Sequence, residues 1–143
     1  LGGKPGVAAE AAEKFKIENL KLKIESDSGP WLDKEGVPVD RQNREKEREI
    51  IKQINQFKPN LLFVGFGAPK QEKWVSRCLR HLEINCAMVV GGAFDYFAGR
   101  VTRAPRWIRN LGLEWFFRLI IEPWRLKRQL TLLRFILSVV KNS

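Results

Sequence analysis

The sequence predicts an α/β fold: a Rossmann-like, open parallel sheet with flanking helices, followed by a basic, amphipathic helical appendage at the C-terminus. Three observations predict it. Short apolar runs at 61–64 and 87–90 have the length and composition of strands buried on both faces. Segments of helical periodicity alternate with these runs, as in a parallel sheet with crossover helices. Beyond residue 99 the chain becomes strongly basic.

The N-terminal half contains two predicted helices, a strand and a loop. Apolar residues recur every three or four positions over 6–18 and over 41–57, where they form one side of a highly charged, amphipathic helix. Residues 20–25 alternate apolar and polar side chains, which predicts a strand. Glycines and prolines over 26–40 predict a loop.

Each later apolar run ends in a glycine-bearing turn. The run at 61–64 is followed by a turn over 65–69, and Pro69 suits the first turn of a helix that extends to about Leu82. The run at 87–90 ends in Gly91 and Gly92. The predicted order is therefore helix, strand, helix, strand, helix, strand, with helical segments after it.

Residues 100–143 are predicted to form an appendage distinct from the α/β part at 1–99. They carry ten Lys and Arg against two Asp and Glu, in a chain of net charge +10. Helices are expected at about 112–121 and 123–141, and the second has an apolar stripe with most basic residues off it. This asymmetry implies an anionic partner: phosphate groups, acidic lipid head groups or nucleic acid.

Composition excludes several classes of site. No apolar stretch reaches the ~20 residues that span a bilayer. The spacing of Cys78 and Cys86 fits neither a zinc knuckle nor a redox pair, so reduced, partly buried thiols of a cytosolic protein are expected. His81 has no evident partner for general base catalysis. Leu1 runs directly into a Gly-rich turn, which indicates a chain truncated at its N-terminus or a mature N-terminus after processing.

Three glycine-bearing turns are expected at the carboxyl edge of the sheet, where open parallel sheets bind ligands. They lie at 2–6, 65–69 and 91–93. Missing side chains let a ligand approach the backbone, and helix N-termini offer N–H groups to phosphate. None of these turns matches a Walker or dinucleotide fingerprint, and each alone is also typical of a tight turn without a ligand.

Polar side chains next to these turns are candidate ligand contacts. Lys70 and Gln71 are expected in the first turn of a helix, from where they could reach a diphosphate or a sugar hydroxyl, although a solvated helix start would look the same. Asp95 follows a strand end, and its carboxylate could accept hydrogen bonds from a ribose or a base. The alternative for Asp95 is a helix cap.

Several long motifs in the same order resemble the WecB/TagA/CpsF glycosyltransferase family. They span 63–74, 91–99, 103–107, 112–118 and 122–125, so that the resemblance covers essentially the whole chain. It implies transfer of a sugar, N-acetylmannosamine or its uronic acid, from UDP to a polyprenyl-diphosphate-linked acceptor. Such transfers serve the synthesis of wall teichoic acid, enterobacterial common antigen or capsule.

The resemblance also implies roles for residues. Gln71 and Asp95 match positions expected to contact the UDP-sugar. Arg118, Arg125 and Arg128 match arginines thought to fold over the site and stabilise the diphosphate leaving group, and arginine suits that task chemically. A membrane or solvent contact is the alternative for each arginine. The full set of predicted substrate-binding residues is Gly2, Gly3, Trp31, Gly65, Gly67, Lys70, Gln71 and Asp95.

Two departures from the family pattern matter. The catalytic base, an Asp, and an acceptor-side Thr are expected in an N-terminal half that would precede Leu1, so no residue of this chain is named as the base and the chain alone is expected to be inactive. Where many members carry a His-Gly-Tyr-Phe-like segment, this chain has Ser28-Gly29-Pro30-Trp31, and Trp31 is the candidate aromatic contact. No cofactor or metal is expected, because no Asp-x-Asp pair is present and arginines can replace the cation.

The expected partners are a UDP-sugar donor, a polyprenyl-diphosphate-linked glycan acceptor and acidic lipids, with a homo-oligomer possible through the apolar tail. The expected location is cytoplasmic, on the inner face of the cell membrane. Two alternatives stay open. One is an inactive, membrane-associated derivative of such an enzyme, and the other is a nucleic-acid-binding module, which the apolar stripe of the last helix disfavours.

Overall fold

The structure, a computed structural model, describes residues 1–18, 21–101 and 104–121. The chain divides into two compact units, Leu1–Thr102 and Arg103–Ser143. The predicted division lay after Gly99. Arg100 stays with the first unit because its guanidinium binds the Glu10 carboxylate through Nε at 2.9 Å and Nη2 at 2.6 Å.

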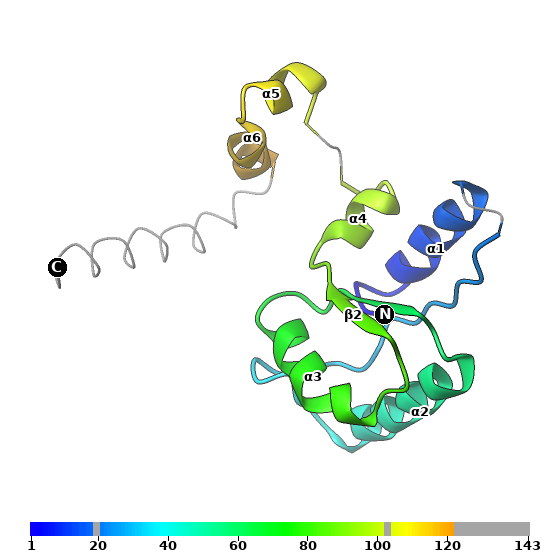
Figure 1. The fold of residues 1–143 in the computed structure, drawn as a ribbon. Helices are drawn as coiled ribbons and strands as arrows, with labels where there is room; N and C mark the ends of the chain where they lie inside the picture. Colours follow the sequence, from blue (N-terminus) through cyan, green and yellow to red (C-terminus); the bar gives the residue numbers. More distant parts are fainter. Residues whose placement is uncertain (19–20, 102–103, 122–143) are drawn as a thin grey trace, which may run out of the picture. The chain divides into compact units, whose positions relative to one another are not determined.

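The first unit is built from helices around a small parallel sheet (Figure 1). The predicted helices at 6–18, 41–57 and 69–82 are confirmed, as are both later strands to within a residue. Asp40 begins the second helix by accepting the N–H of Asn43 at 2.8 Å. The elements are α1 (Val7–Glu18), α2 (Arg41–Phe57), β1 (Leu61–Val64), α3 (Lys70–Cys78) with a 3-10 turn (Leu79–His81), β2 (Cys86–Val89) and α4 (Ala93–Phe97).

The sheet is parallel, as predicted. β1 and β2 pair in register from Leu61 opposite Cys86 to Val64 opposite Val89. α3 forms the crossover between the two strands, which is the connection that parallel pairing requires. Gly2 forms an isolated parallel bridge with Gly65, so the chain before α1 also aligns with β1. The described part of the chain is thus a mixed α/β fold with a small parallel sheet.

The predicted strand at 20–25 is not formed in its described part. Residues 21–25 are not assigned to a strand, and residue 20 lies outside the described residues. An alternating pattern becomes a strand only where a neighbour supplies the ladder of backbone hydrogen bonds. A backbone hydrogen bond of the kind that joins strands lies just beyond the predicted strand, where the N–H of Gly2 donates to the carbonyl of Asp27 at 2.8 Å.

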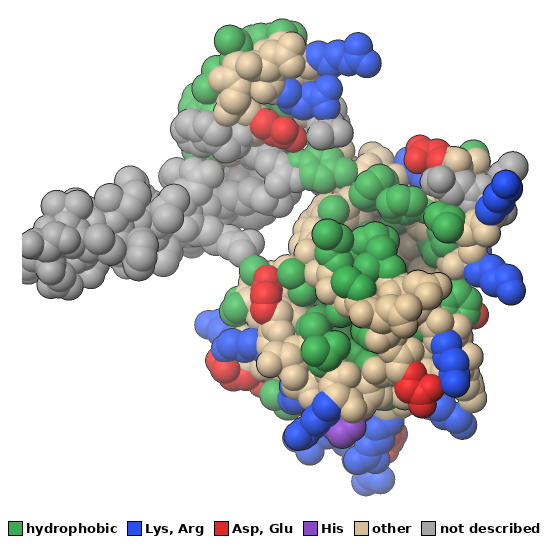
Figure 2. Space-filling model, in the orientation of Figure 1, with side chains coloured by type: hydrophobic (Ala, Val, Ile, Leu, Met, Phe, Trp, Pro, Cys, Tyr) green, Lys and Arg blue, Asp and Glu red, His purple; other side chains and the backbone are tan. Residues whose placement is uncertain are grey.

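The prediction that both later strands are buried on both faces is also wrong. In β1 the side chains of Leu62 and Val64 are buried, but Leu61 is 45% exposed. In β2, Met88 is 53% exposed and Val89 is 40% exposed. Neither apolar cluster of the described residues includes a residue of β2, and Figure 2 shows hydrophobic side chains uncovered over the middle of this unit.

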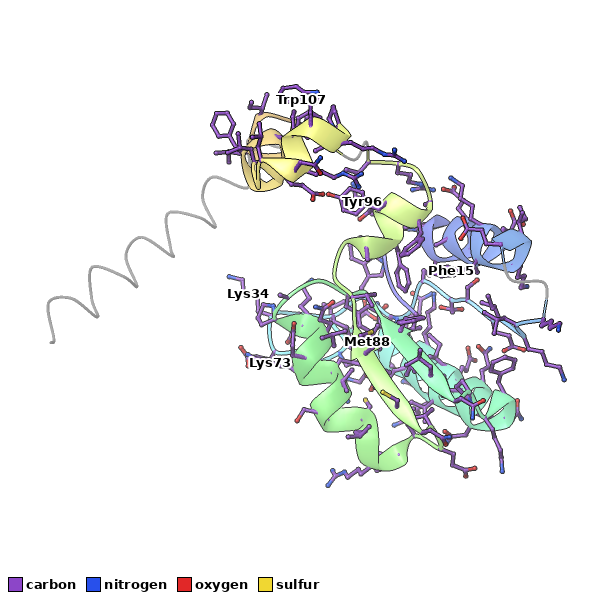
Figure 3. All side chains as sticks on the ribbon, turned by 45° about the horizontal axis from the view of Figure 1, so that its top comes forward. Phe15, Lys34, Lys73, Met88, Tyr96 and Trp107 are labelled. Carbon is purple, nitrogen blue, oxygen red and sulfur yellow. The ribbon has the colours of Figure 1, made fainter. Side chains whose placement is uncertain are left out.

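Two apolar clusters pack against β1. Leu62 and Val64 contact Trp74 and Cys78 of α3, together with Leu32 of the long loop. Phe63 contacts a second cluster made of Val7, Ala11 and Phe94, which joins α1 to α4. Phe15 of α1, labelled in Figure 3, extends this contact by packing on Phe97 with ring centroids 4.3 Å apart. β1 is therefore the strand around which the first unit is organised.

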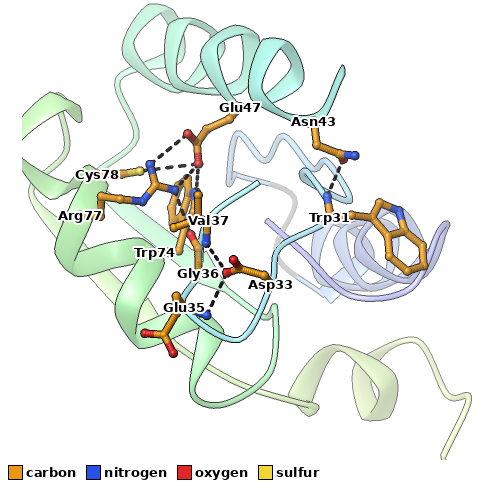
Figure 4. A network of polar contacts seen from close by, with 10 residues as sticks. All are labelled: Trp31, Asp33, Glu35, Gly36, Val37, Asn43, Glu47, Trp74, Arg77 and Cys78. Atoms are coloured by element: carbon orange, nitrogen blue, oxygen red, sulfur yellow. Dashed lines mark hydrogen bonds and ion pairs between the residues drawn. The ribbon is translucent and has the colours of Figure 1, made fainter. Parts of the chain in front are cut away.

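A buried carboxylate joins α2 to α3 (Figure 4). Glu47 is 8% exposed and accepts from the indole N–H of Trp74 at 2.8 Å. Both of its oxygens also bind the guanidinium of Arg77, and that hydrogen bonding raises the pKa of Arg77. Arg77 donates in addition to the carbonyl of Gly36 at 2.9 Å. The network fixes the loop at 31–39 against α3.

Three cations of α3 hold this loop. Besides Arg77, Lys70 donates to the carbonyl of Leu32 at 2.9 Å and Lys73 pairs with Glu35. The loop is closed on itself by an isolated bridge between Leu32 and Pro38. At its tip Gly36 has φ +73°, and a Cβ there would lie 2.8 Å from both the carbonyl oxygen of Lys70 and the N–H nitrogen of Trp74. Only glycine fits this position.

We expect Gly36→Ala to lower the free energy of unfolding by about 2 kcal/mol, because the left-handed conformation alone costs about 1 kcal/mol and the loop must also move away from α3. Urea denaturation measures this change. Gly67→Ala is the matched control: Gly67 has φ +84°, but a Cβ there would meet nothing within 4 Å. Equal losses in the two variants would contradict the proposed close packing of the loop on α3.

The second unit contains α5 (Arg106–Asn110) and α6 (Glu114–Ile121). The predicted helix at 112–121 is confirmed with a later start, α5 was not predicted, and the predicted helix at 123–141 lies outside the described residues. No helix among the described residues is long and apolar enough to cross a bilayer. Several large apolar side chains of this unit are exposed: Trp107, Leu111, Leu113, Phe116, Ile120 and Ile121.

Candidate functional site

The three glycine-bearing turns lie together at the carboxyl edge of the sheet. The N–H of Gly3 donates to the carbonyl of Gly65 at 3.0 Å, and the N–H of Gly65 donates to the carbonyl of Leu1 at 2.8 Å. These bonds join the first turn to the second. The third turn begins where the N–H of Val90 donates to the carbonyl of Val64 at 2.8 Å. The topology thus gathers three turns that are far apart in the sequence.

Gln71 links the second turn to the third. Its side-chain oxygen accepts from the N–H of Gly67 at 3.3 Å and from the N–H of Gly91 at 3.0 Å. Its amide nitrogen donates to Glu72 at 2.9 Å, and the residue is only 5% exposed. A single buried amide therefore fixes the spacing between two turns. In this structure Gln71 positions the backbone, a role that its place in the sequence did not reveal.

Gly65 is the point of closest packing at the site. A Cβ there would lie 2.7 and 2.8 Å from ring atoms of Phe94 and 3.1 Å from the carbonyl oxygen of Gly91. Gly2 is similarly enclosed, with φ +102° and a would-be Cβ 2.8 Å from the carbonyl carbon of Gly65. The absence of side chains at Gly2 and Gly65 lets the turns come together, so these glycines are explained by packing.

Gly67 and Gly91 differ from these two glycines. Gly67 has φ +84° and a would-be Cβ with no atom within 4 Å, and Gly91 has φ +53° and meets only the Gln71 amide at 3.9 Å. Their backbone faces open space, as a ligand approaching the main chain would require. The N-terminus of α3 begins beside Gly67 and adds a partial positive charge.

Asp95 lies in the first turn of the short helix α4, beside Gly92. A Cβ added at Gly92 would lie 3.6 Å from the Asp95 carboxylate. The backbone carbonyl of Asp95 accepts from the N–H groups of Arg100 and Val101 at 2.9 and 3.2 Å. The pKa of Arg100 is raised chiefly by the hydrogen bonds that its guanidinium donates to Glu10, and the negative charge of Asp95 adds to this effect. The half-buried carboxylate thus stands next to the third turn, where the sequence placed it.

The other predicted contacts lie differently. Lys70 is half-buried at the start of α3, but its ammonium binds the carbonyl of Leu32. Trp31 is 70% exposed and is held through its backbone N–H, which donates to Asn43 at 2.7 Å. In Figure 4 the Trp31 ring points away from the network around Glu47. Whether Lys70 and Trp31 contact a ligand stays a prediction. In the structure Lys70 binds the Leu32 carbonyl and the Trp31 ring is exposed.

Of the predicted arginines, Arg118 lies within α6, and Arg125 and Arg128 lie outside the described residues.

Cys78 is buried, and burial raises the pKa of its thiol to about 11, which removes it as a nucleophile at neutral pH. Cys86 is exposed rather than partly buried. His81 ends the 3-10 turn, as expected of a helix end, and its ring accepts from Arg80 at 3.2 Å.

Chemically, the joined turns can bind an anionic, sugar-bearing ligand. They combine uncovered backbone, a helix N-terminus and a nearby carboxylate, which suit phosphate oxygens and hydroxyl groups respectively.

Two comparisons with known proteins identify the family of this chain. The profile of the glycosyl transferase WecG/TagA/CpsF family matches residues 1–143. The chain is 45% identical over 95 residues to a Bacillus subtilis (strain 168) protein named N-acetylglucosaminyldiphosphoundecaprenol N-acetyl-beta-D-mannosaminyltransferase. That match covers 66% of this chain and 37% of the relative, so this chain spans little more than a third of the relative's length. The chain therefore belongs to the WecG/TagA/CpsF family of glycosyl transferases.

Proposed function

We propose that this chain supplies the nucleotide-sugar-binding part of a glycosyltransferase that moves N-acetylmannosamine, or its uronic acid, from UDP to a polyprenyl-diphosphate-linked acceptor. The observation that carries the proposal is the junction of three glycine turns, two of them fixed by the buried amide of Gln71. Family membership and the name of the Bacillus relative support the sugar and the acceptor.

In the proposed reaction an acceptor hydroxyl attacks the anomeric carbon of the donor sugar. The bond from that carbon to the diphosphate oxygen breaks, and UDP leaves with the bonding electron pair. The hydroxyl proton passes to a base that is not assigned to a residue of this chain. Arginine neutralises the charge that develops on the diphosphate, and Arg118, Arg125 and Arg128 are proposed for that role. The proposal includes no metal ion.

The donor would lie across the second and third turns. Its diphosphate would face the exposed backbone at Gly67 and the N-terminus of α3, while Asp95 would accept from hydroxyl groups of the ribose or the base. Lys70 would reach the diphosphate by exchanging its bond to the Leu32 carbonyl for one to a phosphate oxygen. This exchange replaces a neutral acceptor with a charged one, which favours the bound arrangement.

Calorimetric titration of UDP into the chain tests this function. We expect binding by the parent and a loss of about tenfold in affinity for Asp95→Ala, since a hydrogen bond to a charged group contributes about 1.5 kcal/mol. At least the same loss is expected for Gln71→Ala, because it removes the acceptor that joins Gly67 to Gly91. Gln42→Ala, on the exposed side of α2, is the control. Excess EDTA should leave the affinity unchanged. Absence of binding by the folded parent would overturn the proposal that these residues suffice for the nucleotide site.

We propose in addition that the second unit contacts the membrane surface that holds the acceptor. Trp107 is 65% exposed and Ile120 is 65% exposed, in a unit that also carries most of the excess positive charge. Apolar and basic groups together favour acidic lipid surfaces.

Sedimentation with vesicles of phosphatidylglycerol tests the membrane proposal. We expect Trp107→Ser with Ile120→Ser to weaken binding severalfold, whereas vesicles of phosphatidylcholine should bind poorly even to the parent. The same variants should not change binding to single-stranded DNA. Tight, salt-sensitive DNA binding without vesicle binding would instead favour a nucleic-acid-binding module.

A further inference from the structure

Helix α1 holds the C-terminal end of α4. The two helices lie side by side (Figure 1), and Phe15 of α1 packs on Phe97 of α4. The ammonium of Lys14 donates to the carbonyl of Ala98, the residue that ends α4, at 3.0 Å. These contacts restrain one side of a helix that is only five residues long and that carries Asp95 in its first turn.

The end of α4 ties the backbone of Arg100 to Asp95. Gly99 has φ +75°, and its N–H donates to the carbonyl of Tyr96 at 3.0 Å. The N–H of Arg100 donates to the carbonyl of Asp95 at 2.9 Å. This pair of bonds is the Schellman arrangement, which closes a helix on a glycine in the left-handed conformation. The backbone of Arg100 is therefore fixed relative to the backbone of Asp95.

The side chain of Arg100 binds α1 and the first glycine turn. Its guanidinium donates to both carboxylate oxygens of Glu10, from Nε at 2.9 Å and from Nη2 at 2.6 Å. Nη2 also lies 3.5 Å from the carbonyl oxygen of Pro5 in the first turn. A Cβ at Gly6 would lie 3.1 Å from that nitrogen, so the absence of a side chain there leaves room for the guanidinium. Arg100 thus joins the first turn and α1 to the end of α4.

The bidentate pair of Arg100 and Glu10 restrains direction, which apolar packing does not. Two parallel hydrogen bonds hold a guanidinium in the plane of the carboxylate. The aromatic and aliphatic contacts between α1 and α4 are non-directional, so they do not by themselves fix the rotation of the short helix. Hydrogen bonding from Arg100 also holds the pKa of Glu10 below its ordinary value, so that the carboxylate is charged at neutral pH.

We propose that Arg100, held by Glu10, is a positioning residue that sets the place of the Asp95 carboxylate in the donor site. This role rests on the proposed function, in which Asp95 accepts from hydroxyl groups of the donor. Without the pair, α4 would rotate on its apolar contacts, and the carboxylate would move relative to the second and third turns. Arg100 acts on the donor only through Asp95, because its guanidinium is occupied by Glu10.

Calorimetric titration of UDP tests the pair. We expect Arg100→Ala and Glu10→Ala each to weaken UDP binding about threefold to fivefold, and the double variant to lose no more than either alone, since one interaction is lost in all three. The melting temperature should change by less than about 3 °C, because the two side chains are 38% and 46% exposed and exposed pairs contribute little to stability. A merely structural role would lower the melting temperature and leave the affinity of the folded chain unchanged.

A double-mutant cycle with Asp95 separates positioning from direct contact with UDP. In the Asp95→Ala chain, the further change Arg100→Ala should not alter the affinity, because the carboxylate that Arg100 positions is gone. Losses that multiply would overturn the proposal. Arg100→Lys should recover part of the affinity, since an ammonium still pairs with Glu10 but as a point charge. Arg41→Ala, which removes an exposed pair with Glu45 on α2, is the matched control and should bind UDP like the parent.

A pH titration followed by NMR tests the pair without UDP. The Glu10 carboxyl should titrate at lower pH in the parent than in Arg100→Ala, because the hydrogen bonds from the guanidinium lower its pKa. Equal titration would show that the pair does not form and would overturn the proposal. If the folded parent fails to bind UDP, the proposed function is overturned together with this role. If the parent binds UDP and the Arg100 variants bind it equally well, only the positioning role is overturned.

Discussion

Replacing Glu47 with leucine is expected to lower the free energy of unfolding by about 3–5 kcal/mol. Glu47 accepts from Trp74 and from both terminal nitrogens of Arg77, all within the contact between α2 and α3. The substitution leaves the buried indole N–H of Trp74 without its acceptor, and of its described hydrogen bonds Arg77 keeps only the one to the Gly36 carbonyl, which costs more than the burial of leucine returns. Urea denaturation followed by circular dichroism measures the loss.

Glu45→Leu on the same helix is the matched control for Glu47→Leu. Glu45 pairs with Arg41 across one helical turn, but their side chains are 56% and 93% exposed. Exposed pairs of this kind contribute about 0.5 kcal/mol or less. If both substitutions had the same small effect, the network around Glu47 would not hold α2 against α3.

The second large effect is expected from Gly65→Ala, with a loss of stability of about 3 kcal/mol and no measurable UDP binding. The added methyl group would lie 2.7 Å from the ring of Phe94 and 3.1 Å from the carbonyl of Gly91. Overpacking of this size forces elements apart, so α4 must move away from β1 and take the third turn with it. Thermal denaturation and calorimetry with UDP measure the two effects.

Two further variants test the cause of the Gly65→Ala effect. Gly92→Ala adds a methyl group that would meet only the Asp95 carboxylate at 3.6 Å and needs no unusual backbone conformation, so its stability should stay within about 0.5 kcal/mol of the parent. Phe94→Leu should restore part of the stability lost in Gly65→Ala, because the two sites are in contact and their effects cannot be additive. Strict additivity would show that the clash with Phe94 is not the cause.

The sequence predicted the elements whose own pattern is sufficient. Helices α1 and α2 follow from apolar periodicity, and α2 begins where Asp40 caps it. The prediction of a strand at 20–25 was wrong over its described residues, because a strand needs a neighbouring strand and an alternating pattern alone does not supply one. The burial of β2 was overestimated for the same reason: an apolar run shows what a strand can bury, not what packs against it.

The site was predictable in outline but not in its details. Topology places turns at the carboxyl ends of parallel strands, so the meeting of Gly65 and Gly91 followed from the order of elements. The link through Gln71 depends on a side-chain rotamer that no spacing reveals. Glu47 was missed although a signal existed: it precedes Ile50 by three positions and Ile54 by seven, which places a carboxylate on the apolar side of α2.

The most direct test of the central claim, that the three turns form one nucleotide site, is an NMR titration of the isotopically labelled chain with UDP. We predict that the backbone amides of Gly3, Gly67, Gly91 and Gly92 shift together along one binding curve, while Gly36 and Gly112 stay in place. Shifts confined to the second unit, or separate curves for the second and third turns, would contradict the claim.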